Sequence, residues 1–130
     1  MYGRNAYQQS AAQTASPAQL VLMLYDGALL RMEQAVEALE EPQDLMVAHT
    51  GIMKAQRIID ELELSLDHDQ GGEIAANLAA IYVYVGELLL EGNLQKEPRM
   101  LRDAIEVLTP LRDTWERACV NGPVGAAVAG

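Results

Sequence analysis

The chain has 130 residues and a formal net charge of −10 at pH 7; half of its residues are hydrophobic, but only 5% are aromatic and none is phenylalanine. This size is typical of one domain with its own core, and the acidic balance argues against nucleic acid or an anionic membrane surface as a partner. The single cysteine, Cys119, excludes an internal disulfide and fits a reducing compartment.

The first 15 residues are small and polar, and they lack the apolar middle of a signal peptide. We expect residues 1–15 to form a mobile arm that carries Tyr7. The apolar run from Leu20 to Leu24 is stopped by Asp26 and is far too short to span a membrane, so no membrane insertion is predicted. Together these features predict a soluble cytoplasmic protein.

The first long helix is predicted over residues 17–40. Ser16 offers a hydroxyl acceptor at the N-cap, and Pro17 suits the first helical position, where its missing N–H costs nothing. Pro42 ends the helix. Its apolar stripe alternates spacings of three and four: Leu22, Tyr25, Leu29, Met32, Val36 and Leu39.

A second helix is predicted over residues 44–66 from an unbroken repeat of the same kind: Leu45, Ala48, Ile52, Ala55, Ile59, Leu62 and Leu66. Residues 67–72 are polar and end in two glycines, which predicts a turn.

The third helix, over residues 72–91, is apolar on nearly every side. We expect its core stripe to be Ile74, Leu78, Ile81, Val85 and Leu88. Further apolar residues lie beside that stripe: Ala75, Ala79, Tyr82 and Leu89, then Ala76, Ala80, Val83 and Leu90. Gly92 and Asn93 are the expected left-handed C-cap.

The fourth helix is predicted to begin at Pro98 and to stop before residue 121, with a kink at Pro110. Helices of similar length with short links favour antiparallel neighbours. The sequence therefore predicts an all-α, antiparallel up-down-up-down four-helix bundle over residues 16–120, followed by a disordered tail over 121–130.

The sequence offers little catalytic chemistry. His68, between two aspartates in a turn, and Cys119, near a helix end, have no convergent partners by helical spacing. We predict no enzyme activity, no cofactor and no metal site.

The surplus apolar surface of the third helix predicts a binding site, because large exposed apolar patches usually mark an interface. A partner's amphipathic helix could lie in a groove between two bundle helices. Two alternatives stay open: a self-associating bundle that hides this helix in a homodimer, and a bundle enzyme with a buried metal.

Five stretches follow one another in a distinctive order: TASPAQLVLMLYDGAL (14–29), KAQRIIDEL (54–62), LDHDQGGEIAANL (66–78), IYVY (81–84) and LLLEGN (88–93). Their order and spacing resemble those of the flagellar export chaperone family FliS, over about residues 1–117. The resemblance implies a cytoplasmic four-helix bundle that binds the disordered C-terminal segment of flagellin. It also implies that binding prevents premature polymerisation, keeps flagellin competent for flagellar type III export, and lets the loaded complex dock at the export gate.

The resemblance further implies that grooves around the last three helices receive the flagellin segment, and that Tyr7 in the arm covers part of a groove. Combined with the surplus apolar surface, it gives a set of expected contact residues: Tyr7, Ile58, Leu62, Asn77, Ile81, Tyr84 and Leu88.

Overall fold

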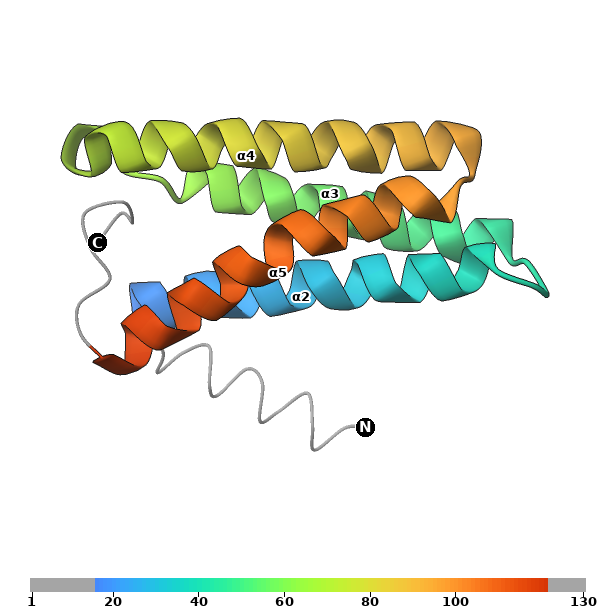
Figure 1. Ribbon diagram of the computed structural model, residues 1–130, viewed down its shortest axis with the longest axis horizontal. Coiled ribbons are helices and arrows are strands. Elements are labelled where there is room, and N and C mark those ends of the chain that lie inside the picture. The colour runs from blue at the N-terminus through green and yellow to red at the C-terminus, as the bar shows by residue number, and fades with distance from the viewer. Residues whose placement is uncertain (1–15, 122–130) are drawn as a thin grey trace.

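The computed structural model describes residues 16–121, which form four α-helices. The helices are α2 (Pro17–Leu39), α3 (Leu45–Leu64), α4 (His68–Gln95) and α5 (Pro98–Asn121). Consecutive helices run in opposite directions (Figure 1), and both α2 and α4 pack against α3 and α5. The predicted all-α four-helix fold is confirmed. The expectations for residues 1–15, Tyr7 among them, and for the tail lie outside the described residues.

The helix starts follow the predicted capping chemistry. Ser16 Oγ accepts a hydrogen bond from the backbone N–H of Gln19 at 3.2 Å, and Gln19 Oε1 accepts one from the backbone N–H of Ser16 at 2.9 Å. This reciprocal pair satisfies two backbone donors that a helix start otherwise leaves free. At the other two starts one carboxylate oxygen acts as the acceptor: Asp44 Oδ1 accepts from the backbone N–H of Val47 in α3, and Asp67 Oδ1 accepts from those of Asp69 and Gln70 in α4.

The core lies along the bundle axis and is built from the inward stripes of all four helices. Its one cross-helix polar contact among the fully buried side chains joins the hydroxyls of Tyr25 and Tyr82, whose oxygens are 2.6 Å apart. Gly51 of α3 lies against α2, where an added Cβ would be 3.3 Å from the carbonyl oxygen of Arg31. A side chain there would be tight against the α2 backbone, which would have to shift by a few tenths of an ångström to admit it.

The ends of α4 differ from those predicted. The helix begins at His68 instead of residue 72 and bends at Gly72, whose φ of 51° and ψ of −124° suit glycine. It continues past Gly92 to Gln95, and Lys96, at φ 52°, is the left-handed C-cap. The predicted cap at Gly92 and Asn93 is therefore wrong. Gly92 is instead buried, with an added Cβ 3.2 Å from Leu101 Cδ2, so its role is to let α5 approach.

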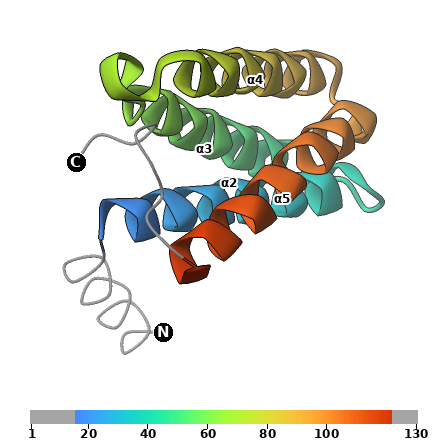
Figure 2. The same cartoon turned by 60° about the vertical axis from the view of Figure 1, so that its left-hand side comes forward.

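α5 begins at Pro98 as predicted and continues as one helix through Pro110. Proline removes one backbone hydrogen bond there. The residue directly before it, Thr109, donates its Oγ1 hydrogen to the carbonyl oxygen of Ile105, one turn earlier, at 2.7 Å. α5 crosses the bundle obliquely: it starts beside the end of α4 and finishes near the start of α2 (Figures 1 and 2).

Among the described helices, α4 alone is long and apolar enough to cross a membrane by length and composition, although the sequence predicted no insertion. Only 28% of that apolar window is buried in the bundle. A bundle helix with one face in the core and other apolar faces outside meets the same criterion. The packing of α4 against α3 and α5 is of that kind.

Candidate partner-binding surface

α4 carries more apolar area than the bundle covers. Its core residues are Ala75, Leu78, Tyr82, Val85 and Leu89. Its exposed large apolar residues are Ile74 (65%), Val83 (49%), Tyr84 (49%), Leu90 (52%) and Leu94 (73%). The predicted core stripe is thus partly wrong: of its five members only Leu78 and Val85 are buried, while Ile81 and Leu88 are half-buried and Ile74 is exposed.

One side of α4 is buried at its C-terminal end and exposed at its N-terminal end. Gly92 and Ile74 are 18 residues apart, about five full turns, so they point the same way. Gly92 is buried against Met100 and Leu101 of α5, Leu88 and Ile81 are half-buried, and Ile74 is 65% exposed. α5 therefore covers one end of this side and leaves the other end open.

We call this side the α4/α5 edge. Helical spacing places its residues within one quadrant of the helix: Ile74, Asn77, Ile81, Tyr84 and Leu88.

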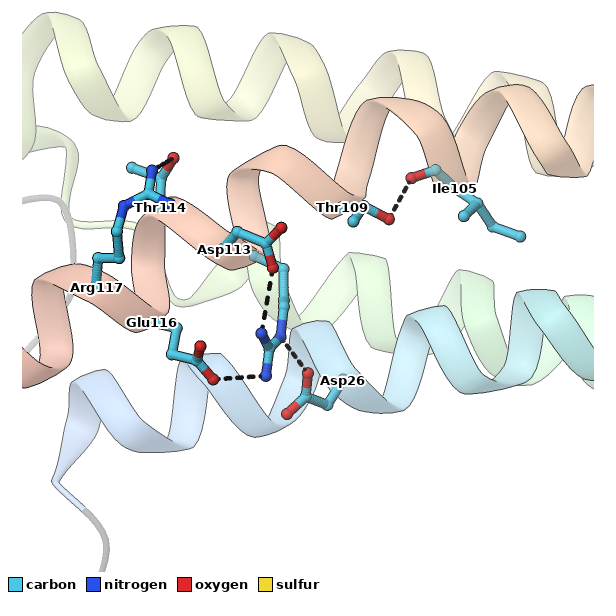
Figure 3. Close-up of polar contacts among 8 residues, drawn as sticks. Asp26, Ile105, Thr109, Asp113, Thr114, Glu116 and Arg117 are labelled. Carbon is cyan, nitrogen blue, oxygen red and sulfur yellow. Dashed lines mark hydrogen bonds and ion pairs between the residues drawn. The ribbon is translucent and has the colours of Figure 1, made fainter.

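The course of α5 explains why the edge is open. Arg112 Nε donates to Asp26 Oδ1 of α2 at 2.7 Å, and Figure 3 shows Asp26 reaching toward α5 beside Glu116. Trp115 Nε1 donates to the carbonyl oxygen of Ala18 at 3.0 Å. Both contacts fasten the C-terminal half of α5 to α2. That half consequently leaves the N-terminal half of α4 uncovered, as Figures 1 and 2 show.

Four of the predicted contact residues come together on the α4/α5 edge: Asn77 and Tyr84 are exposed, and Ile81 and Leu88 are half-buried. Ile58 lies elsewhere, on the side of α3 that faces α2, since its Cδ1 is 3.4 Å from an added Cβ at Gly27.

Leu62 is 0% exposed and belongs to the core, so in this bundle its side chain is not accessible to a partner. The three-four repeat on α3 had already marked it as a core position. Ile74 is a residue of the edge that the sequence missed, because it was assigned to the core stripe.

Two observations describe the polar groups that could take part in chemistry. Within residues 16–121 no group of three or more His, Cys, Asp or Glu side chains is placed to hold a metal ion. Burial and the nearby Glu116 carboxylate raise the pKa of the Cys119 thiol, which makes it a poorer nucleophile.

An uncovered apolar helix side on a bundle is the kind of surface that protein-binding modules use. The family model described as "Flagellar protein FliS" matches residues 1–122. The chain therefore belongs to the FliS family of flagellar secretion chaperones, which are not enzymes. The resemblance noted in the sequence is confirmed.

Two relatives named "Flagellar secretion chaperone FliS" show the degree of similarity. The Salmonella typhimurium protein is 36% identical over 120 residues, covering 88% of each chain. The Bacillus subtilis protein is 35% identical over 113 residues, covering 87% of this chain and 83% of its own. A solved structure titled "Crystal structure of flagellar chaperone from bacteria" shares the fold, with a TM-score of 0.75 at 20% identity over 92% of this chain and 98% of that one.

Proposed function

We propose that this chain is a cytoplasmic export chaperone that binds the disordered C-terminal segment of flagellin. Binding keeps the segment from polymerising before export and holds flagellin competent for flagellar type III export. The loaded complex then docks at a component of the export gate. Family membership and the open apolar edge support the proposal.

The main support for the proposal is the decrease in burial along the α4/α5 edge, from buried Gly92 to exposed Ile74. An amphipathic helix of the client can lie along this edge and supply the missing cover. Burying about 1,000 Å² of apolar surface gives about 25 kcal/mol before the costs of association and of ordering the segment remove most of it. A disordered client is suited to this mode, since it can fold onto the surface as it binds.

The proposed contacts on the edge are Asn77, Ile81, Tyr84 and Leu88, with Ile74 added at its open end. Tyr7 is proposed to cover part of the edge when no client is bound. Ile58 lies on another face, so it takes part only if the client continues around the bundle onto α2 and α3.

Tyr84 and Val83 provide a matched test, because each is 49% exposed and they are adjacent in sequence. Helical geometry turns them about 100° apart, so Tyr84 is on the α4/α5 edge and Val83 is not. Binding of a labelled peptide, the last 40 or so residues of the host flagellin, would be measured by fluorescence anisotropy. We expect Tyr84→Glu to weaken binding at least about tenfold and Val83→Glu to leave it unchanged, with both melting temperatures near wild type. Equal binding by all three proteins would contradict the proposed site.

Self-association is the competing use of the same apolar surface. Light scattering over a dilution series, with and without the peptide, distinguishes peptide binding by a monomer from self-association. We expect a monomer that forms a one-to-one complex. A dimer that the peptide fails to dissociate would favour the self-associating bundle.

A further inference from the structure

The two halves of α5 are packed very differently. The buried residues of α5 that the structure describes all precede Pro110: Met100, Leu101, Ala104 and Leu108. Among residues 111–119 none is buried, and Leu111 and Trp115 are only half-buried against the core. A helical segment with few buried apolar contacts belongs to the least stable part of a domain. The C-terminal half of α5 can therefore change position at a lower cost than the N-terminal half.

The two halves meet at a position that favours a bend. Pro110 has no N–H to donate to the carbonyl oxygen of Glu106, so one backbone hydrogen bond of the helix is missing there. The hydroxyl of the neighbouring Thr109 donates to the carbonyl oxygen of Ile105, and such a bond also tends to bend a helix. Sharp changes of helix direction are usually found at prolines. A hinge therefore lies where the buried part of α5 ends.

Two hydrogen bonds hold the C-terminal half of α5 on α2, and we call them the α2/α5 latch. Arg112 Nε donates to Asp26 Oδ1 at 2.7 Å, and Trp115 Nε1 donates to the carbonyl oxygen of Ala18 at 3.0 Å. Because this half has no buried residue among 111–119, the latch contributes a large share of what fixes its position.

Two further carboxylates fix the direction of the Arg112 side chain. Its Nη1 donates to Asp113 Oδ1 at 3.2 Å and its Nη2 donates to Glu116 Oε2 at 2.8 Å. Both carboxylates belong to α5 itself, and Figure 3 shows them together with Asp26 around one guanidinium group. With all three nitrogens bonded, the guanidinium group is held in the orientation that reaches α2.

The open end of the α4/α5 edge offers this half of α5 an alternative contact. Consecutive helices run in opposite directions, so α4 begins and α5 ends at the same end of the bundle (Figures 1 and 2). Ile74, which is 65% exposed, lies near that end. If the half helix turned about Pro110 toward α4, Leu111 and Trp115 could bury apolar surface against this edge. The latch on α2 opposes that movement.

We propose that Arg112 and Trp115 are positioning residues for client binding: by holding the C-terminal half of α5 on α2, they keep the α4/α5 edge open. This inference rests on the proposed function, since the edge is the proposed client site. Neither residue has to touch the client. Without the latch, the half helix turns about Pro110 onto the edge, and the client must displace it. If only about one-fifth of the molecules then stay open, the apparent affinity falls about fivefold.

The single cysteine provides a probe of this movement that needs no client. Cys119 lies in the C-terminal half of α5, so a nitroxide attached to it broadens the NMR signals of the methyl groups that it approaches. We expect Arg112→Met to increase the broadening of the Ile74 methyl signal in the full-length protein. Trp115→Phe removes the other hydrogen bond of the latch and should act in the same direction. Unchanged broadening in both variants would overturn the inference.

A matched control and a rescue separate the latch from a general loss of charge or stability. Arg117 is an exposed arginine in the same half of α5, and its hydrogen bond to Thr114 Oγ1, at 3.2 Å, stays within that helix (Figure 3). Arg117→Met should therefore leave the Ile74 signal as in the wild type. The double variant Asp26→Arg/Arg112→Asp restores an ion pair between α2 and α5 with the charges exchanged, and it should reverse the broadening. Exposed ion pairs contribute little to stability, so the Tm of Arg112→Met should stay near that of the wild type.

The affinity for the labelled C-terminal flagellin peptide is then measured on the same proteins. We expect Arg112→Met to weaken binding about fivefold, Arg117→Met to leave it unchanged, and the double variant to restore it. Increased broadening with no loss of affinity would refute the positioning role. If the wild-type protein fails to bind the peptide, the proposed function fails, and the broadening of Ile74 still decides whether the latch holds α5 away from α4.

Discussion

Replacing each of two glycines in α4 with alanine should have opposite effects on stability. Gly86 and Gly92 are six residues apart in the same helix, and in both cases alanine gains helix propensity. At Gly86 the added methyl group enters open space. At Gly92 it would lie 3.2 Å from Leu101 Cδ2 and 3.3 Å from Met100 Cβ, so α5 must move away or strain.

The expected magnitudes follow from these two environments. Gly86→Ala should raise the free energy of unfolding by about 1 kcal/mol, the propensity difference alone. Gly92→Ala has at most the same gain, offset by an overpacking cost of about 1 to 3 kcal/mol, so we expect a net loss of about 1 kcal/mol. For a domain of this size, about 1 kcal/mol corresponds to a shift of about 4 °C in Tm.

Urea unfolding followed by circular dichroism at 222 nm measures both changes. If the dependence of the free energy of unfolding on urea concentration (the m value) is the same in both variants, the shift in midpoint reports a change in stability alone. If Gly92→Ala is as stable as Gly86→Ala, then α5 does not pack on α4 at this end. The description of the α4/α5 edge as covered by α5 at its C-terminal end would then be wrong as well.

Three further predictions concern the core and the end of α4. Tyr82→Phe leaves the buried Tyr25 hydroxyl without a partner, so we expect it to cost about 1 to 3 kcal/mol, while the double variant Tyr25→Phe/Tyr82→Phe stays near wild type in urea unfolding. Burial raises the pKa of both phenols above 10, so these phenols ionise in the unfolded protein at a lower pH than in the folded protein. Their contribution to the free energy of unfolding is therefore complete below pH 10. Above pH 10 it is lost by about 2.7 kcal/mol per pH unit for the two phenols together. Urea midpoints at pH 9 and 11 should show this loss in the wild type and not in the double variant. Lys96→Gly should raise Tm by a few degrees, because glycine adopts a φ of 52° without strain, and a lower Tm would show that the Lys96 side chain matters more than its backbone.

The sequence predicted the helices well because their signals are local. The hydroxyl of Ser16 followed by Pro17, and Pro98 before the last helix, mark helix starts through groups only a few residues away. The surplus apolar area of the third helix was also visible, since Val83, Tyr84 and Leu90 add bulk beside a sufficient core stripe. All three are exposed.

What the sequence could not predict depends on distant contacts. Leu88 and Leu89 are equally apolar, so periodicity alone does not decide which of them faces the core. The open edge follows from hydrogen bonds of Arg112 and Trp115 to residues 86 and 97 positions earlier in the chain. Gly92 has the appearance of a helix end, and only the approach of α5 shows that it is a packing position.

The most direct test of the central claim, that a client covers apolar surface that α4 cannot bury, is a methyl NMR titration of the full-length protein with the C-terminal flagellin peptide. We expect one-to-one binding that moves the methyl signals of Ile74, Ile81 and Leu88. Calorimetry of the same titration should give a heat-capacity change of about −0.4 kcal/mol/K, as burial of about 1,000 Å² of apolar surface requires. Tight binding that leaves the Ile74 methyl unmoved and exposed would contradict the account.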